Sequence, residues 1–222
     1  MNIVFLTGLP RSGSTLFCSI LAQNPDIHTG RLSNLCDLMW NAQYGLNNYA
    51  GISGKPADNH NYIISKLPDL YYEGNNKKVI IDQCRGWTLP PNFDLITKYI
   101  NTNPKILCLT RDIDDVRKSY ENLFLENERN DFSGSGYELE LMRNVSAVEY
   151  AKTLPQEFVH FINYNELVLN TLDVLKNVYS FIGEKVFNHD LENIVCNFED
   201  DESHGGLLGL HTVRNTIGFR TN

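Results

Sequence analysis

The feature that most constrains this chain is a glycine-bearing loop between two apolar segments at its start. The run "NIVFLT" is followed by "GLPRSGST" and then by "LFCSILAQ". Four residues separate Gly8 from Gly13, a spacing typical of the strand–loop–helix motif whose backbone N–H groups hold a phosphate at a helix N-terminus. The sequence therefore predicts a buried strand, an anion-binding loop and a helix, in this order. A plain strand-to-helix turn is the alternative.

Ser14 is the informative position within this loop. A nucleotide-hydrolysing loop, G-x-x-x-x-G-K-[ST], has a lysine there that bridges the β- and γ-phosphates, and the next residue holds Mg²⁺. Without that lysine, a metal-bound triphosphate fits poorly, and we expect a single 5′-phosphate that carries a less charged group. The residues expected to contact it are Pro10, Arg11, Ser12, Gly13, Ser14 and Thr15.

Length and charge limit the classes of protein that remain. The 222 residues, 42% of them hydrophobic, suffice for one domain over residues 1–222, in which 199–222 forms a lid or a tail. A net charge of −8 argues against a nucleic-acid surface, which needs clustered Lys and Arg. No apolar run approaches the roughly 18 to 20 residues of a membrane span. We expect a soluble, cytoplasmic protein.

The cysteines and histidines do not follow a metal-binding pattern. The five cysteines include no C-x-x-C pair, and the six histidines include no H-x-x-x-H pair. Reduced and mostly buried thiols are therefore expected rather than a disulfide framework or a zinc site. We predict no metal.

Four short runs rich in β-branched and aromatic residues have the composition of buried strands. They span residues 2–7, 78–82, 105–110 and 158–163. Apolar residues with helical spacing lie between and after these runs. The clearest pattern predicts a single helix after the fourth run, ended by Gly183, and another helix is predicted to begin near Asp112. The polar segment 127–138 is expected to be a mobile loop. The alternation predicts an α/β fold of three layers, with a mostly parallel central sheet flanked by helices.

Three segments resemble the sulfotransferase family, most closely its tyrosylprotein and related bacterial or viral branch. "GLPRSGSTLFCSILAQNPDI" resembles the family's 5′-phosphosulfate-binding loop. "LCLTRDIDDVRKSYENLF" is similar to the segment that binds a 3′-phosphate, with Arg111 and Ser119 in its key positions. "INYNELVLNTLDVLKNVYSFIG" is similar to the late Tyr-x-x-Leu segment and contains Tyr164. The three occur in the family's order between residues 4 and 183.

The resemblance implies a P-loop-type fold and a donor, 3′-phosphoadenosine 5′-phosphosulfate (PAPS), whose sulfuryl group moves to a hydroxyl or amine without a metal. The product is adenosine 3′,5′-bisphosphate (PAP). Arg111 and Ser119 would bind the 3′-phosphate, although Arg111 could instead pair with Asp112 or Asp114. Two alternatives are a nucleotide or nucleoside kinase, in which Asp82 would end a Walker-B strand, and a non-catalytic PAPS- or PAP-binding protein.

The catalytic positions of the resembled branch are not filled in this chain. Leu32 stands where the branch has a glutamate, and Gln83 or Cys84 where it has a lysine. We predict Asp82 as the base or as a group that orients the acceptor, with Asp37 as the other candidate. A capping role for Asp82 is the alternative.

Positive charge at the reaction centre is assigned to three arginines. Arg11 would stabilise the leaving phosphate, Arg85 would contact the sulfonate, and Arg214 would close over the donor phosphates unless it is a solvated tail residue. The acceptor, whose class is left open, should bind in a pocket formed chiefly by segments 32–75 and 127–150. Aromatic residues there would line a sugar or aryl site, although at helical spacing such residues more often belong to the core; they include Trp40, Tyr44, Tyr49, Tyr71 and Tyr72.

Overall fold

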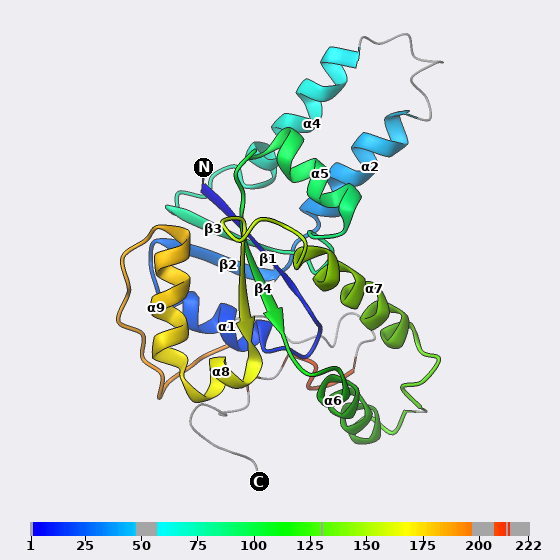
Figure 1. Ribbon diagram of the computed structural model, residues 1–222, viewed down its shortest axis with the longest axis vertical. Helices are drawn as coiled ribbons and strands as arrows, with labels where there is room; N and C mark the ends of the chain where they lie inside the picture. Colours follow the sequence, from blue (N-terminus) through cyan, green and yellow to red (C-terminus); the bar gives the residue numbers. More distant parts are fainter. Residues whose placement is uncertain (1, 48–56, 130, 197–206, 212, 214–222) are drawn as a thin grey trace.

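The computed structural model describes residues 2–47, 57–129, 131–196, 207–211 and 213. A five-stranded parallel sheet lies at the centre, in the order β2-β3-β1-β4-β5 (Figure 1). The strands are β1 (Asn2–Gly8), β2 (Ile27–Leu32), β3 (Val79–Gln83), β4 (Lys105–Thr110) and β5 (Val159–Asn163). The predicted α/β fold with a mostly parallel sheet is confirmed.

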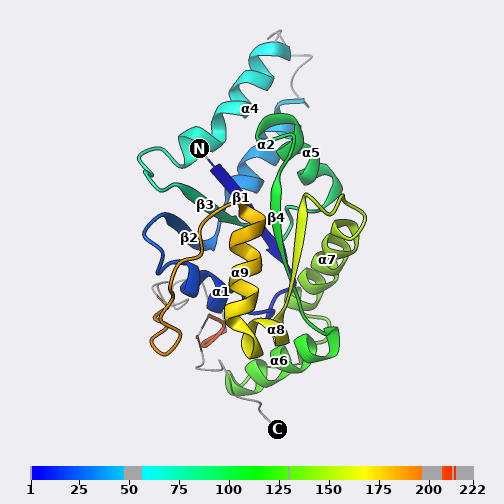
Figure 2. The same cartoon turned by 60° about the vertical axis from the view of Figure 1, so that its left-hand side comes forward.

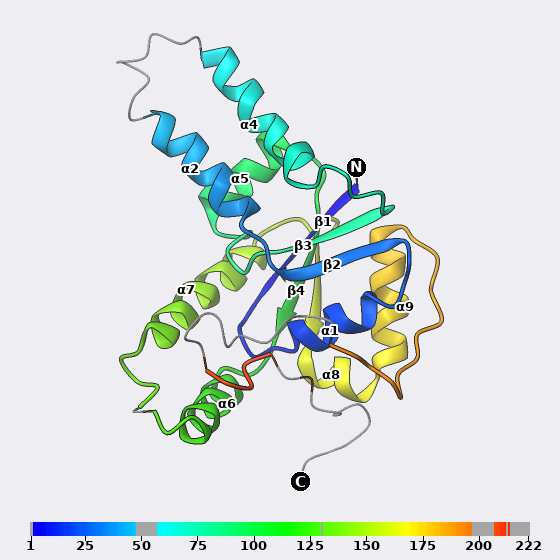
Figure 3. The same cartoon turned by 180° about the vertical axis from the view of Figure 1, so that it is seen from behind.

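Helices cover both faces of this sheet and complete the three layers. The helices are α1 (Ser14–Leu21), α2 (Leu35–Asn47), α4 (Ala57–Tyr71), α5 (Pro90–Tyr99), α6 (Ile113–Glu126), α7 (Gly136–Ala151), α8 (Tyr164–Leu169) and α9 (Thr171–Ile182). Figure 2 shows α1 and α9 on one face and α7 on the other. The pair formed by α2 and α4 extends beyond the sheet (Figure 3).

The central strand β1 explains why the layers hold together. Its side chains are buried on both faces, as is usual in parallel sheets. Val4 and Leu6 pack in one cluster with α1, α8 and α9, whereas Ile3 and Phe5 pack in a second cluster with α2, α5 and α7. The loop after β1 therefore emerges from a buried strand at the centre of the sheet, where its position is well fixed.

Most predicted elements are confirmed, but three details were wrong. The four predicted strands match β1, β3, β4 and β5 to within one residue, and Gly183 ends α9 with φ 76°. β2 was not predicted. The helix predicted over 164–182 is two helices that break at Asn170, and the loop predicted over 127–138 already contains the start of α7 at Gly136.

The described part of the predicted lid or tail, residues 207–211 and 213, packs against the rest of the protein. Leu207 is buried, and Leu208 is held by Asn127 through two hydrogen bonds, of 2.7 Å to its backbone N–H and 3.0 Å to its carbonyl. A role as a lid stays a prediction. Among the described residues, no helix combines the length and the apolar character needed to cross a membrane.

Candidate anion-binding site

The loop after β1 depends on glycine because its backbone runs directly against β4. Gly8 has φ 128°, and a Cβ there would lie 2.1 Å from the carbonyl oxygen of Leu109. The next residue continues this contact, since Leu9 N–H donates to the same oxygen at 2.9 Å. No side chain larger than hydrogen fits at Gly8 without moving a strand.

The second glycine places the loop beside α8. Gly13 has φ 87°, and a Cβ there would lie 2.9 Å from Cδ2 of Tyr164. Arg11, between the glycines, has φ 56°, a left-handed conformation that is uncommon for a residue with a side chain. Gly13 is the N-cap of α1 and has no side chain with which to cap the helix, and no acidic residue occupies the first turn. The helix N-terminus is thus left for an external anion.

Two arginines meet at this loop from different parts of the chain. Nε of Arg11 donates to Oγ of Ser119 on α6 at 3.1 Å, and its guanidinium also donates to the carbonyl of Leu210. Arg111, just after β4, donates from a terminal nitrogen to the carbonyl oxygen of Arg11 at 2.8 Å. The guanidinium of Arg111 stacks 4.2 Å from the ring centre of Tyr164. The structure therefore brings Arg11, Arg111, Ser119 and Tyr164 together, and their binding of a donor stays a prediction.

These contacts do not use all the N–H donors of the Arg111 guanidinium. Its Nε is buried and has no hydrogen-bond partner within the described residues. Within the described residues, Arg111 makes no ion pair with Asp112 or Asp114. The carboxylate of Asp112 instead accepts the backbone N–H groups of Asp114 and Asp115. A buried guanidinium N–H without an acceptor is costly. The site is therefore suited to a bound anion.

The remaining predicted loop residues differ in their surroundings. Ser12 is fully buried and donates its hydroxyl to the carbonyl of Leu9, so its side chain supports the loop. Pro10 is buried as well, whereas Ser14 and Thr15 are half-buried at the start of α1. Their contacts with a ligand stay predictions. Arg214 lies outside the described residues.

Asp82, the predicted base, is enclosed at the end of β3. It is 0% exposed, and its two oxygens accept from Tyr72 Oη at 2.5 Å and from Trp87 Nε1 at 2.6 Å. Burial raises the pKa of this carboxyl, and the hydrogen bonds oppose that rise only in part. These contacts favour the structural alternative for Asp82. The other candidate, Asp37, is exposed on α2.

Arg85 has a partner that the sequence did not reveal. Its guanidinium forms an ion pair with Glu140 on α7, and the side chains are 15% and 40% exposed, respectively. Tyr120 lies within the electrostatic reach of this pair: burial raises its pKa to about 12, Arg85 and Arg11 oppose the rise, and Glu140 adds to it. The charges of Arg85, Glu140 and Arg11 thus all act on the same phenol. No motif distinguishes Glu140 from the other acidic residues of α7.

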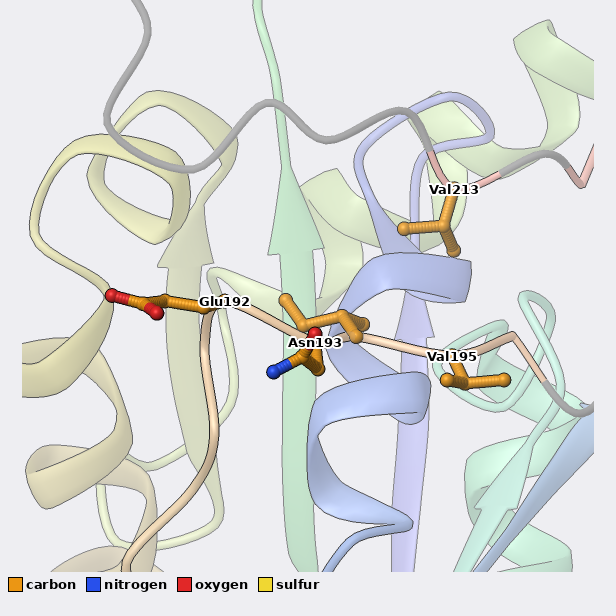
Figure 4. Close-up of a pocket in the computed structure, with 5 residues that line it drawn as sticks. Glu192, Asn193, Val195 and Val213 are labelled. Atoms are coloured by element: carbon orange, nitrogen blue, oxygen red, sulfur yellow. The ribbon is translucent and has the colours of Figure 1, made fainter.

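Of two hollows in the protein, one includes a residue of the site. One, of about 360 Å³, is bounded by Arg111, Leu9 and Phe161 together with residues of α6 and α7. The other, of about 310 Å³, is lined by Glu192, Asn193, Ile194, Val195 and Val213 (Figure 4). Ile194 and Val213 pack against the cluster that contains α1, so this hollow lies on the α1 face of the sheet. Within the ranges that the structure describes, no three His, Cys, Asp or Glu side chains gather as metal ligands.

Known proteins share the fold of this chain, and one family model shares its sequence pattern. A family model described as the sulfotransferase family matches residues 3–188. No curated protein sequence matches the chain. Among solved structures, the sulfotransferase domain of the Synechococcus PCC 7002 olefin synthase is 18% identical, with a TM-score of 0.59 over 84% of this chain and 74% of that chain.

Two further structures are similar. The sulfotransferase domain of the curacin biosynthetic pathway is 17% identical, with a TM-score of 0.57 over 84% of this chain and 75% of its own. A mouse sulfotransferase complexed with PAP is 16% identical, with a TM-score of 0.51 over 99% of this chain and 75% of that chain. At these identities, the likeness shows a common fold.

Proposed function

Because this chain belongs to the sulfotransferase family, we propose that it transfers a sulfuryl group from PAPS to a hydroxyl or amine of an acceptor. The observation that carries the proposal is the meeting of Arg11, Arg111, Ser119 and Tyr164 at the Gly13 loop, with Nε of Arg111 buried and unpaired in the described structure. Two arginines and an uncapped helix N-terminus provide places for two phosphates.

The donor would occupy these two places at once. The 5′-phosphosulfate would lie at the N-terminus of α1, where loop N–H groups and Arg11 stabilise the charge that develops on the leaving phosphate. Arg111 and Ser119 would hold the 3′-phosphate. Transfer of a sulfuryl group then depends mainly on alignment and charge stabilisation, as in phosphoryl transfer. The residues do not require a metal for this arrangement.

The kinase alternative is less well supported by the same residues. Ser14 occupies the position of the lysine that would bridge β- and γ-phosphates. Asp82, which would approach Mg²⁺ in a Walker-B strand, has each oxygen occupied by a neutral donor, Tyr72 or Trp87. Both features fit a donor with one 5′-phosphate better than a triphosphate with its metal.

Thermal unfolding with two ligands tests the donor assignment. PAP in the absence of Mg²⁺ should raise the melting temperature, since a ligand at 100 times its dissociation constant stabilises the folded state by about 2.7 kcal/mol. ATP with Mg²⁺ should have a much smaller effect. Stabilisation by ATP with Mg²⁺ but not by PAP would overturn the proposal.

Transfer of the label from sulfur-labelled PAPS to phenols, sugars and amines tests catalysis and separates an enzyme from a non-catalytic binder. Labelled product that forms with protein and is absent without it supports an enzyme. PAP binding with no labelled product from any of these acceptors supports the binder.

A further inference from the structure

The ion pair of Arg85 and Glu140 joins the segment after β3 to α7. Arg85 follows the carboxyl end of β3, and Glu140 lies in the second turn of α7. The carbonyl of Arg85 accepts the hydroxyl of Thr7 at 2.7 Å, which fixes this residue to β1 just before Gly8. Ends of neighbouring parallel strands are where ligands bind in open α/β sheets.

Tyr120 connects this ion pair to the proposed donor site. It is 1% exposed and follows Ser119, the residue that accepts from Arg11. The phenol group is sensitive to the charges of Arg11, Arg85 and Glu140 together. The ring of Tyr120 also lies 5.7 Å, between ring centres, from that of Tyr137, three residues before Glu140 on α7. The part of α6 that carries Ser119 thus packs against the part of α7 that carries Glu140.

Both members of the pair keep hydrogen-bonding capacity. Within the described structure, the contact of Glu140 with Arg85 uses Oε1, which leaves Oε2 to accept a proton. Nε of Arg85 is buried and has no acceptor among the same residues. The side chain of Glu140 is 40% exposed, whereas Asp82 is 0% exposed and has both oxygens occupied. Glu140 can thus meet an acceptor that Asp82 cannot reach.

We propose that Glu140 is the base that activates the acceptor, and that Arg85 orients this carboxylate and contacts the sulfonate; this rests on the proposed sulfuryl transfer. Oε2 of Glu140 takes the proton of the acceptor hydroxyl while the hydroxyl oxygen forms a bond to sulfur. The bond between sulfur and the 5′-phosphate oxygen breaks, and its electron pair stays on PAP. Glu140 then releases its proton to water.

Glu140→Gln tests this assignment because glutamine keeps the size and an amide oxygen for Arg85. The matched control is Glu138→Gln, which alters a second Arg–Glu pair on α7, formed with Arg117 at 2.9 Å. Labelled PAPS is supplied with water, phenol or p-nitrophenol as the acceptor, and PAP binding is measured by calorimetry. We expect Glu140→Gln to lower turnover by about 10²- to 10⁴-fold, with PAP affinity and melting temperature close to those of the control.

The acidity of the acceptor distinguishes a base from a residue with a merely structural role, because loss of a structural residue should lower turnover equally with acidic and less acidic acceptors. The loss caused by Glu140→Gln should be larger with phenol than with the more acidic p-nitrophenol, which needs less help in losing its proton. An equal loss with both phenols, or turnover equal to that of the control, would overturn the role of Glu140. Wild-type protein that binds PAP but transfers label to none of the three acceptors would overturn it too, while failure to bind PAP would overturn the donor proposal instead.

Discussion

At the scale of single residues, Arg111 is the group on which the proposed donor site most depends. It contacts the loop through the carbonyl of Arg11, stacks on Tyr164 and keeps a buried Nε without a partner in the described structure. A side chain held from two directions loses little further freedom when it binds a ligand. Its charge is therefore already oriented for an anion.

Replacement of Arg111 by alanine should weaken PAP binding by about 10- to 100-fold, since a charge-assisted hydrogen bond contributes about 1.5 to 3 kcal/mol. Arg143→Ala, which removes an exposed arginine of α7, is the control and should leave affinity unchanged. Calorimetric titration with PAP measures both. Equal affinity of the two variants would remove Arg111 from the site.

Residues of the site differ in how well the sequence predicts them. The loop, Arg111, Ser119 and Tyr164 belong to segments with recognisable spacing, and the structure brings them together. Glu140 was not predicted because its partner Arg85 is 55 residues away, and nothing in the local sequence of α7 indicates that they meet. Asp82 has a favourable position at the end of a strand, but its burial follows from Tyr72 and Trp87, which no local pattern reveals.

At the scale of elements, α6 positions Ser119 and is started by a side-chain cap. The carboxylate of Asp112 accepts the backbone N–H groups of Asp114 at 2.9 Å and Asp115 at 3.2 Å. These bonds satisfy donors that the first turn of a helix otherwise leaves unpaired. The cap thus fixes where α6 begins, directly after Arg111.

Asp112→Ala should lower the free energy of unfolding by about 1 kcal/mol through loss of this cap. Asp115→Ala on the same helix is the control; it removes one exposed acidic residue but no cap, and should cost only a few tenths of a kcal/mol. Urea unfolding followed by circular dichroism compares them. A larger effect for Asp115→Ala would contradict the capping role.

The elements that the sequence did not predict have physical explanations. β2 reads "IHTGRL", which has a glycine and few apolar residues, and it lies at the sheet edge where only one neighbour pairs with it. The helical pattern over 164–182 continues across Asn170, where the backbone turns to φ −126° and ψ 40°. Asn170 then begins α9, and periodicity alone does not show such a break.

At the scale of the whole molecule, Asp82 joins the sheet to the helices on one face. Tyr72, just after α4, and Trp87, before α5, both donate to its carboxylate. Because burial holds its pKa above the usual value, the folded protein binds this proton more tightly than the unfolded chain. Stability from this group is present at acid pH and is lost as the pH rises through the folded-state pKa.

Asp82→Asn should remove this pH dependence, because an amide carries no charge between acid and neutral pH. The amide oxygen can still accept the hydrogen bond of Trp87. Urea unfolding of both proteins from acid to neutral pH provides the test. Carboxyls with lowered pKa, such as those of Glu138 and Asp190, give the opposite trend but cancel in the difference between the two proteins. The wild type should lose stability relative to the variant as the pH rises; a constant difference would contradict this.

The contact between Gly8 and Leu109 has a consequence for which nucleotides can bind. Gly8 and Leu109 are register partners in adjacent strands, Leu9 N–H bonds to the Leu109 carbonyl, and Arg111 bonds to the Arg11 carbonyl. The main chain of β4 and of the loop therefore holds the Arg111 side chain close to the helix N-terminus. Under the proposed function we therefore expect a nucleotide with phosphates on the 3′ and 5′ positions of one ribose to bind more tightly than its 2′,5′ isomer.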